Sequence, residues 1–149
     1  MQIYVDADAC PVKDEVLKVA ERHKLPIHMV SNIWVRGPES PLINRVVVPE
    51  GPDVADDWIA ERCEIGDVVI TSDVPLAARC VPKGAKVLGP TGKTFTPDSI
   101  GMQLATRDLM TSLREQGEIT SGPRSFRKED RSAFLQALEK AIQDSKRGR

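Results

Sequence analysis

The chain has 149 residues, of which 40% are hydrophobic and 29% charged, and this composition is typical of one soluble globular domain with a core of ordinary size. The net charge of −1 is unevenly spread, because residues 1–120 carry 13 Lys and Arg against 18 Asp and Glu, whereas residues 121–149 carry 8 basic and 4 acidic residues. No apolar stretch approaches the ~20 residues that span a bilayer, and the first residues do not form a signal peptide, so we expect a cytoplasmic protein with no membrane partner.

The first half of the chain alternates short apolar segments with helical patterns. Pro11 suits the first position of a helix, Pro26 ends that helix, and Asp53 can cap the helix that follows the break at Pro49–Pro52. The expected elements are strands at Ile3–Asp6, Ile27–Ser31 and Arg45–Val48 and helices at Val12–Lys24 and Asp53–Cys63.

The second half continues the alternation and ends in two helices. Ser72 or Asp73 can cap a short helix after the fourth strand, and an apolar stripe that includes Phe134 and Leu138 marks the last helix. The expected elements are strands at Val68–Thr71 and Ala85–Leu88, helices near Asp98–Glu115 and Arg127–Ser145, and a flexible connection at Gly117–Ser125.

Short apolar strands that alternate with helices indicate a parallel sheet covered on both faces. We therefore predict a single α/β domain over residues 1–149, built as a three-layer sandwich around a mainly parallel five-stranded sheet. Residues 121–149 form a basic C-terminal segment and helix. Such a segment beside an acidic body can attract phosphate groups, although a solvated terminal helix is the simpler explanation.

Carboxylates follow several of the predicted strands. Ligands of a parallel sheet bind outside the carboxyl ends of its strands, and neighbouring strands lie only about 4.8 Å apart. Crowded carboxylates raise each other's pKa, and a hard cation such as Mg²⁺ or Mn²⁺ relieves that repulsion. Such an ion can activate water and stabilise charge on a phosphoryl group, which points to phosphodiester hydrolysis. The carboxylates expected at this edge are Asp6 and Asp8 after the first strand, Asp53, Asp56 and Asp57 at the start of the helix that follows the third, and Asp73 after the fourth.

Several of these aspartates also have a purely structural explanation. Asp53 and Asp73 are plausible N-caps, and Asp56 favours the positive end of its helix. Asp6 has no such clear capping role at a strand end. Asp67 precedes its strand and therefore lies at the opposite edge of the sheet, so we exclude it from the site.

Three segments of the chain, in order, resemble the YaiI/YqxD family. They are Val5-Asp6-Ala7-Asp8-Ala9-Cys10-Pro11, Asp53-Val54-Ala55-Asp56 and Gly66-Asp67-Val68-Val69-Ile70-Thr71-Ser72-Asp73-Val74-Pro75-Leu76-Ala77, and the resemblance continues through Gly122-Pro123 and Asp130-Arg131. The family's architecture is similar to that of the PIN-like nucleases, which have a parallel sheet in the order 3-2-1-4-5 with acidic residues at the strand ends.

The resemblance implies a role for each matching aspartate. Asp6 corresponds to the acid of the first strand and Asp73 to the acid after the fourth, while Asp53 or Asp56 stands for the acid on the intervening helix. Asp8 is an additional carboxylate of the family's opening motif. The implied activity is metal-dependent cleavage of nucleic acid.

Our hypothesis is a PIN-like nuclease that uses Mg²⁺ or Mn²⁺ and a metal-bound water as nucleophile, acts on RNA in preference to DNA, and can form a homodimer. The catalytic residues are Asp6, Asp8, Asp56 and Asp73, and the metal ligands are these four together with Asp53. The predicted substrate-binding residues are Asn32, Ser72, Lys93, Arg124 and Arg127.

Two other classes of function stay open. Asp6-Ala7-Asp8 also resembles the opening of a haloacid-dehalogenase-type phosphatase, in which Asp6 would be the nucleophile and Thr71 or Ser72 the strand-end hydroxyl. The late acidic pair of such enzymes is missing after Leu88. Alternatively, the chain is a non-catalytic nucleic-acid-binding module whose phosphate contacts come from the basic segment. Its contacts would be Arg124, Arg127, Lys128 and Arg131.

Some further residues have competing interpretations. Gly92-Lys93-Thr94 is a turn and not a P-loop, because Val87 stands where that motif requires glycine. Asn32 and Ser72 can be a turn residue and a helix cap instead of site residues. We expect Trp34 and Trp58 to be core or interface residues and not base-stacking ones. Of the cysteines, Cys63 and Cys80 are expected in the core, whereas Cys10 precedes a helix whose N–H groups can lower a thiol pKa.

Overall fold

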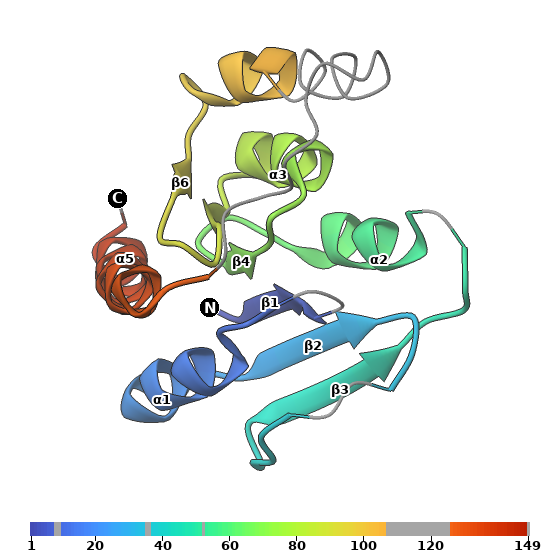
Figure 1. The fold of residues 1–149 in the computed structure, drawn as a ribbon, viewed down its shortest axis with the longest axis vertical. Helices are drawn as coiled ribbons and strands as arrows, with labels where there is room; N and C mark the ends of the chain where they lie inside the picture. The colour runs from blue at the N-terminus through green and yellow to red at the C-terminus, as the bar shows by residue number, and fades with distance from the viewer. Residues whose placement is uncertain (8–9, 35–36, 52, 107–125, 149) are drawn as a thin grey trace.

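The computed structural model describes residues 1–7, 10–34, 37–51, 53–106 and 126–148, and these form one sheet with helices on both faces (Figure 1). The strand order is β3-β2-β1-β4-β5-β6, and all neighbouring pairs are parallel except β5 and β6. The strands are β1 (Ile3–Asp6), β2 (Ile27–Ser31), β3 (Ile43–Val47), β4 (Val68–Ile70), β5 (Lys86–Leu88) and β6 (Thr94–Phe95). The predicted α/β sandwich and the order of its five parallel strands are confirmed.

The sheet differs from the prediction in its sixth strand and in the bounds of β3, which starts at Ile43 and not at Arg45. β6 has two residues and pairs antiparallel with β5, Phe95 opposite Val87 and Thr94 opposite Leu88. Two residues are too few to give an alternating pattern in the sequence, so this short edge strand was not predicted.

Helices form the two outer layers. α1 (Lys13–His23) and α5 (Lys128–Lys146) cover one face of the sheet, and α2 (Val54–Arg62) and α3 (Val74–Cys80), followed by the 3₁₀ turn η2 (Val81–Lys83), cover the other. Residues 100–106 are helical as well, while the rest of the helix expected to Glu115 and the connection 117–125 lie outside the described residues. Within the described chain, no helix combines the length and apolar character that crossing a bilayer requires.

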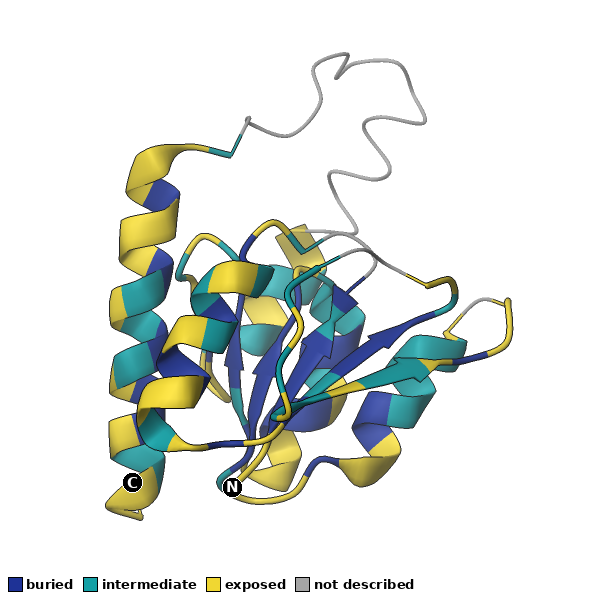
Figure 2. Ribbon diagram, turned by 90° about the horizontal axis from the view of Figure 1, so that it is seen from below, coloured by how far each residue is buried: buried dark blue, intermediate teal, exposed yellow. Residues whose placement is uncertain are grey.

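Alternation along β1 fixes which face each side chain meets. Ile3 and Val5 pack into one core with Phe134 of α5, whereas Tyr4 belongs to the second core, between the sheet and α2 and α3. Buried residues concentrate on the sheet and on the helix faces turned toward it (Figure 2). Because side chains alternate, Asp6 points to the same side as Tyr4, toward α2 and α3.

Gly92 lies in a tight turn between β5 and β6. Its N–H donates to the carbonyl of Gly89 at 3.0 Å, and its φ is +89°. Strand β6 begins directly after Lys93, so no helix follows the Gly92-Lys93-Thr94 segment. This confirms the turn and excludes the phosphate-binding loop.

Candidate functional site

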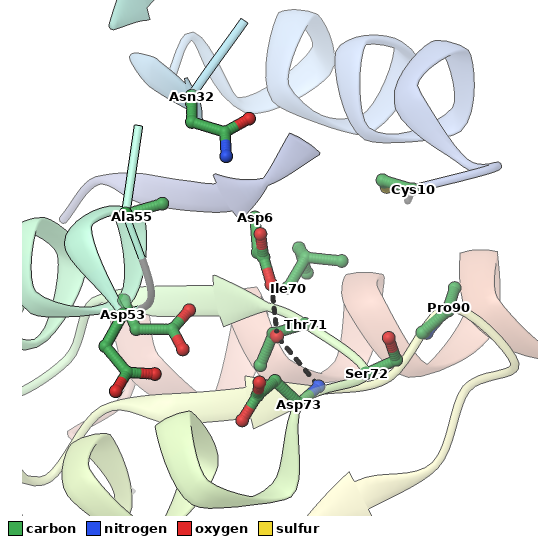
Figure 3. Close-up of a pocket in the computed structure, with 12 residues that line it drawn as sticks. Asp6, Cys10, Asn32, Asp53, Ala55, Ile70, Thr71, Ser72, Asp73 and Pro90 are labelled. Carbon is green, nitrogen blue, oxygen red and sulfur yellow. Dashed lines mark hydrogen bonds between the residues drawn. The ribbon is translucent and has the colours of Figure 1, made fainter. Parts of the chain in front are cut away.

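A pocket of about 300 Å³ opens at the carboxyl edge of the sheet, beside the start of α2 and the junction of β4 with α3 (Figure 3). Four of its lining residues are aspartates that come from separate parts of the sequence. Asp6 ends β1, Asp53 and Asp56 belong to the start of α2, and Asp73 precedes α3. These four aspartates therefore line one pocket.

Thr71 connects the ends of two strands within the pocket. Its hydroxyl donates to Oδ2 of Asp6 at 3.0 Å and accepts a hydrogen bond from the backbone N–H of Asp73 at 3.0 Å (Figure 3). The side chain is 2% exposed, so these bonds are shielded from water. Thr71 thereby sets the position of one acid and of the chain that carries another.

Asp73 has both a structural and a candidate chemical role. Its Oδ1 accepts a hydrogen bond from the N–H of Leu76 at 3.0 Å, which confirms that it caps α3. Capping uses one lone pair of one oxygen, and the side chain still lines the pocket.

Asp53 does not cap α2 in the manner expected. It occupies the N-cap position, but its φ of 64° is left-handed and its side chain makes no capping hydrogen bond. Aspartate tolerates this conformation better than most residues, yet the strain is of a kind that concentrates at functional sites. The side chain lines the pocket instead, so capping does not explain this residue.

The negative charges of the neighbouring acids affect the pKa of Asp56. Its pKa is raised to about 6, chiefly by burial and then by the negative charges of Asp73, Asp6 and Asp53, in that order of strength. Arg79 opposes this shift only weakly, and its guanidinium pairs with Asp57 at 2.5 Å. The pocket is thus a place where added positive charge is favourable.

The donors fit a hard divalent cation held partly through water. Asp6, Thr71 and Asn32, whose side chains all carry oxygen, line the same space, and no histidine lines it among the described residues. In that part of the chain, no three Asp, Glu, His or Cys groups lie close enough to bind one ion directly. Mg²⁺ commonly keeps several waters and takes only one or two carboxylates, so this wide pocket suits it.

The predicted substrate-binding residues divide into two groups. Asn32 and Ser72 line the acidic pocket as expected. Lys93 lines a different hollow, beside Val74 and Met102, and Arg127 lies at the start of α5, where its N–H donates to Asp130 at 2.9 Å. Neither belongs to the acidic pocket. The predicted site residues Asp8 and Arg124 lie outside the described residues.

Six lining residues were not predicted as residues of the nuclease site: Cys10, Gly51, Ala55, Ile70, Thr71 and Pro90. Thr71 ends a β-branched run, so its sequence pattern predicts a strand residue and gives no sign that its hydroxyl binds Asp6. For Cys10, burial raises the thiol pKa, which outweighs the opposing effects of the Val12 N–H and of Lys13. The N–H group at the helix start does lower the pKa of this thiol, but burial has the larger effect and the net shift is upward.

Other residues that we placed outside the site have structural roles. Asp67 is 7% exposed and accepts hydrogen bonds from the N–H groups of Gln2 at 3.0 Å and Glu64 at 2.9 Å, at the opposite edge of the sheet. Cys63 and Cys80 are buried free thiols of the core. These expectations are confirmed.

Comparison with known proteins places this geometry in an uncharacterised family. The sequence model of a family described as "Uncharacterized BCR, YaiI/YqxD family" matches residues 4–144. The chain is 60% identical to a UPF0178 protein of Rhodospirillum rubrum over 150 residues, covering 100% of both chains. It is 57% identical to a UPF0178 protein of Bradyrhizobium diazoefficiens over 148 residues, covering 99% of this chain and 89% of the relative. No solved structure matches the chain significantly.

Proposed function

We propose that this chain, which belongs to the YaiI/YqxD family, is a divalent-metal-dependent nuclease that hydrolyses phosphodiester bonds in RNA or DNA. The observation that carries the proposal is the pocket in which Asp6, Asp53, Asp56 and Asp73 converge from three parts of the chain. Such a site attracts Mg²⁺ or Mn²⁺, and either ion can supply an activated water and stabilise the charge of a phosphoryl group.

Each acid has a role suited to its surroundings. Asp6, held by Thr71, and Asp73, fixed by the start of α3, are the best-oriented ligands. Asp56 lines the same pocket and is the candidate base for an attacking water. Asp53 adds charge at the rim of the site.

The pocket favours a nuclease over the phosphatase alternative. Among its described lining residues there is no lysine or arginine that would hold a transferred phosphoryl group. Neutralisation of the phosphate then falls to the metal ion. Beryllofluoride separates the two chemistries, because a phosphatase that forms an aspartyl phosphate traps it on Asp6, whereas a nuclease of this kind does not.

The activity test compares single-stranded RNA and DNA oligonucleotides, with Mn²⁺ or EDTA, for the parent, Asp6→Asn and Asp57→Asn. Asp57 is the matched control, because it lies beside Asp56 but pairs with Arg79 and does not line the pocket. We expect cleavage by the parent and by Asp57→Asn in Mn²⁺, and none by Asp6→Asn. Equal cleavage by Asp6→Asn and the parent would exclude this mechanism.

A further inference from the structure

The Trp34 side chain is largely exposed to solvent, which is unfavourable for an apolar indole. The residue is 62% exposed, and its neighbour Ile33 is 58% exposed, so the expectation of a core position for Trp34 is wrong. Trp58, the second tryptophan, is only partly exposed and packs against Tyr4 and His28, as expected. Burial of an indole contributes more free energy than burial of a small side chain. An exposed indole beside another exposed apolar residue is therefore a candidate ligand-binding surface.

The surroundings of Trp34 are basic. Lys13, Trp34 and Arg45 line one small hollow of about 10 Å³ at the β3 edge of the sheet, whose other lining residues are mostly apolar. The Lys13 ammonium donates to the carbonyl of Cys10 at 3.1 Å. The Arg45 guanidinium lies 5.6 Å from the centre of the Trp34 ring and donates to the carbonyl of Pro38 at 2.6 Å. An aromatic ring beside two cations has the chemistry that recognises a base with its flanking phosphates.

This basic hollow adjoins the acidic pocket along the carboxyl edge. Asp6 lines the pocket and Ala7 lines the hollow, and Asn32 lines the pocket where Ser31 lines the hollow. Because side chains alternate along a strand, the two sites open on either side of the same edge.

A short turn links the two sites. The Ser31 hydroxyl donates to the carbonyl of Ile33, which shapes the chain between Asn32 and Trp34. Trp34 is two residues from Asn32, so their Cα atoms lie at most about 7 Å apart. The two sites therefore begin within a few ångströms of each other along the backbone.

Taking the proposed nuclease as its basis, we propose that Trp34 is a base-stacking subsite that holds an unpaired nucleobase next to the phosphodiester bond in the acidic pocket. Lys13 and Arg45 face the phosphates that flank that base. The occupant is a single strand, because a base inside a duplex is already stacked on its neighbours and presents no open face.

The test uses tryptophan fluorescence, since the chain has two tryptophans and Trp58→Phe leaves Trp34 as the reporter. Hexauridylate is titrated into Trp58→Phe in EDTA, where a metal-dependent nuclease does not cleave it. We expect the fluorescence of Trp34 to be quenched, and a hexamer with abasic sugars to leave it unchanged. An equal response to both oligomers would mean that the phosphates alone are bound, and would overturn the proposal.

A second measurement keeps Trp58 in place. Anisotropy of labelled hexauridylate should show about tenfold or greater loss of affinity in Trp34→Ala and a smaller loss in Trp34→Phe, which retains a ring. Unchanged affinity in Trp34→Ala would overturn the subsite. If that variant instead changes the oligomeric state in sedimentation while its affinity is unchanged, the exposed ring belongs to an interface between copies of the chain, and the subsite is likewise overturned.

The subsite and the nuclease proposal can fail separately. Asp6→Asn should lose cleavage yet keep the quenching, because it leaves Trp34 in place. Quenching by a parent protein that never cleaves would reject the nuclease and retain the subsite. If Trp34→Ala changes neither cleavage nor affinity for the oligonucleotide, the subsite is rejected and the nuclease is retained.

Discussion

The Thr71 hydroxyl joins Asp6 to the segment that carries Asp73, through hydrogen bonds of 3.0 Å on each side. β1 and β4 are neighbours in the sheet although 65 residues separate Asp6 from Thr71 in the chain. A buried hydroxyl at this position thus holds two acids of the candidate site in a fixed relation.

Thr71→Val removes that hydroxyl while keeping the shape of the side chain. We expect a loss of about 2 kcal/mol in the free energy of unfolding, because the buried N–H of Asp73 loses its partner. Urea unfolding measures this, with Thr71→Ser, which keeps the hydroxyl, as the control. Unchanged stability in Thr71→Val would show that the hydrogen bonds of the hydroxyl do not stabilise the fold.

The pH dependence of stability should report the repulsion on Asp56. Its pKa is raised from 3.8 to about 6 in the folded chain, so between those values the folded state binds more protons than the unfolded state. Stability therefore falls as pH rises through this range when no metal is added. Because the group is partly solvated, we expect Asp56→Asn to be more stable than the parent by only about 1 kcal/mol at pH 7.5.

Urea unfolding in EDTA at pH 7.5 and near pH 3.5 tests this expectation. The advantage of Asp56→Asn should vanish at the lower pH, where Asp56 is protonated in both folded and unfolded states. An advantage of the same size at both pH values would mean that charge repulsion is not its cause.

Two variants separate the role of Asp73 as the cap of α3 from its proposed role as a metal ligand. Asp73→Asn keeps a side-chain oxygen that can accept from Leu76 N–H, whereas Asp73→Ala removes the cap. We expect Asp73→Ala to lose about 1 kcal/mol of stability and Asp73→Asn much less, while both lose affinity for Mn²⁺. Thermal unfolding and calorimetry measure the two effects. Full Mn²⁺ affinity in Asp73→Asn would show that Asp73 caps α3 but does not contribute to metal binding.

The fold was predictable from the sequence because its strongest signals are local. Prolines end or begin helices, and β-branched runs such as Val68–Ile70 mark buried strands. The placement of Asp6 and Asp73 at one pocket was also predictable, because neighbouring parallel strands end at the same edge of the sheet. This prediction does not require knowledge of side-chain contacts.

The remaining details depend on tertiary contacts that no local pattern contains. Asp53 looked like an N-cap, but its left-handed backbone turns the side chain to the pocket. Lys93 looked free to meet a phosphate, but the turn at Gly92 and strand β6 place it at another hollow. Trp34 looked like a core residue by its type, yet it lies on the surface beside Arg45.

Gly92 should be intolerant of any side chain. A Cβ there would lie 2.8 Å from the backbone carbonyl of Ala133 in α5, and its φ of +89° disfavours other residues. We expect Gly92→Ala to destabilise the fold by more than 1 kcal/mol. Gly101→Ala is the control, since that glycine lies in a helical segment with nothing within 4 Å of a Cβ, and it should be neutral or slightly stabilising. Similar effects of the two changes on the melting temperature would contradict the packing of α5 described above.

Calorimetric titration of Mn²⁺ into the parent, Asp53→Asn and Asp57→Asn is the most direct measurement of whether the four carboxylates form one cation site. Asn tolerates the left-handed backbone of residue 53, which makes no capping bond, so the fold should be retained. We predict one Mn²⁺ site in the parent and in Asp57→Asn, and binding at least tenfold weaker in Asp53→Asn. Absence of Mn²⁺ binding by the parent, or equal affinity in all three proteins, would contradict the account.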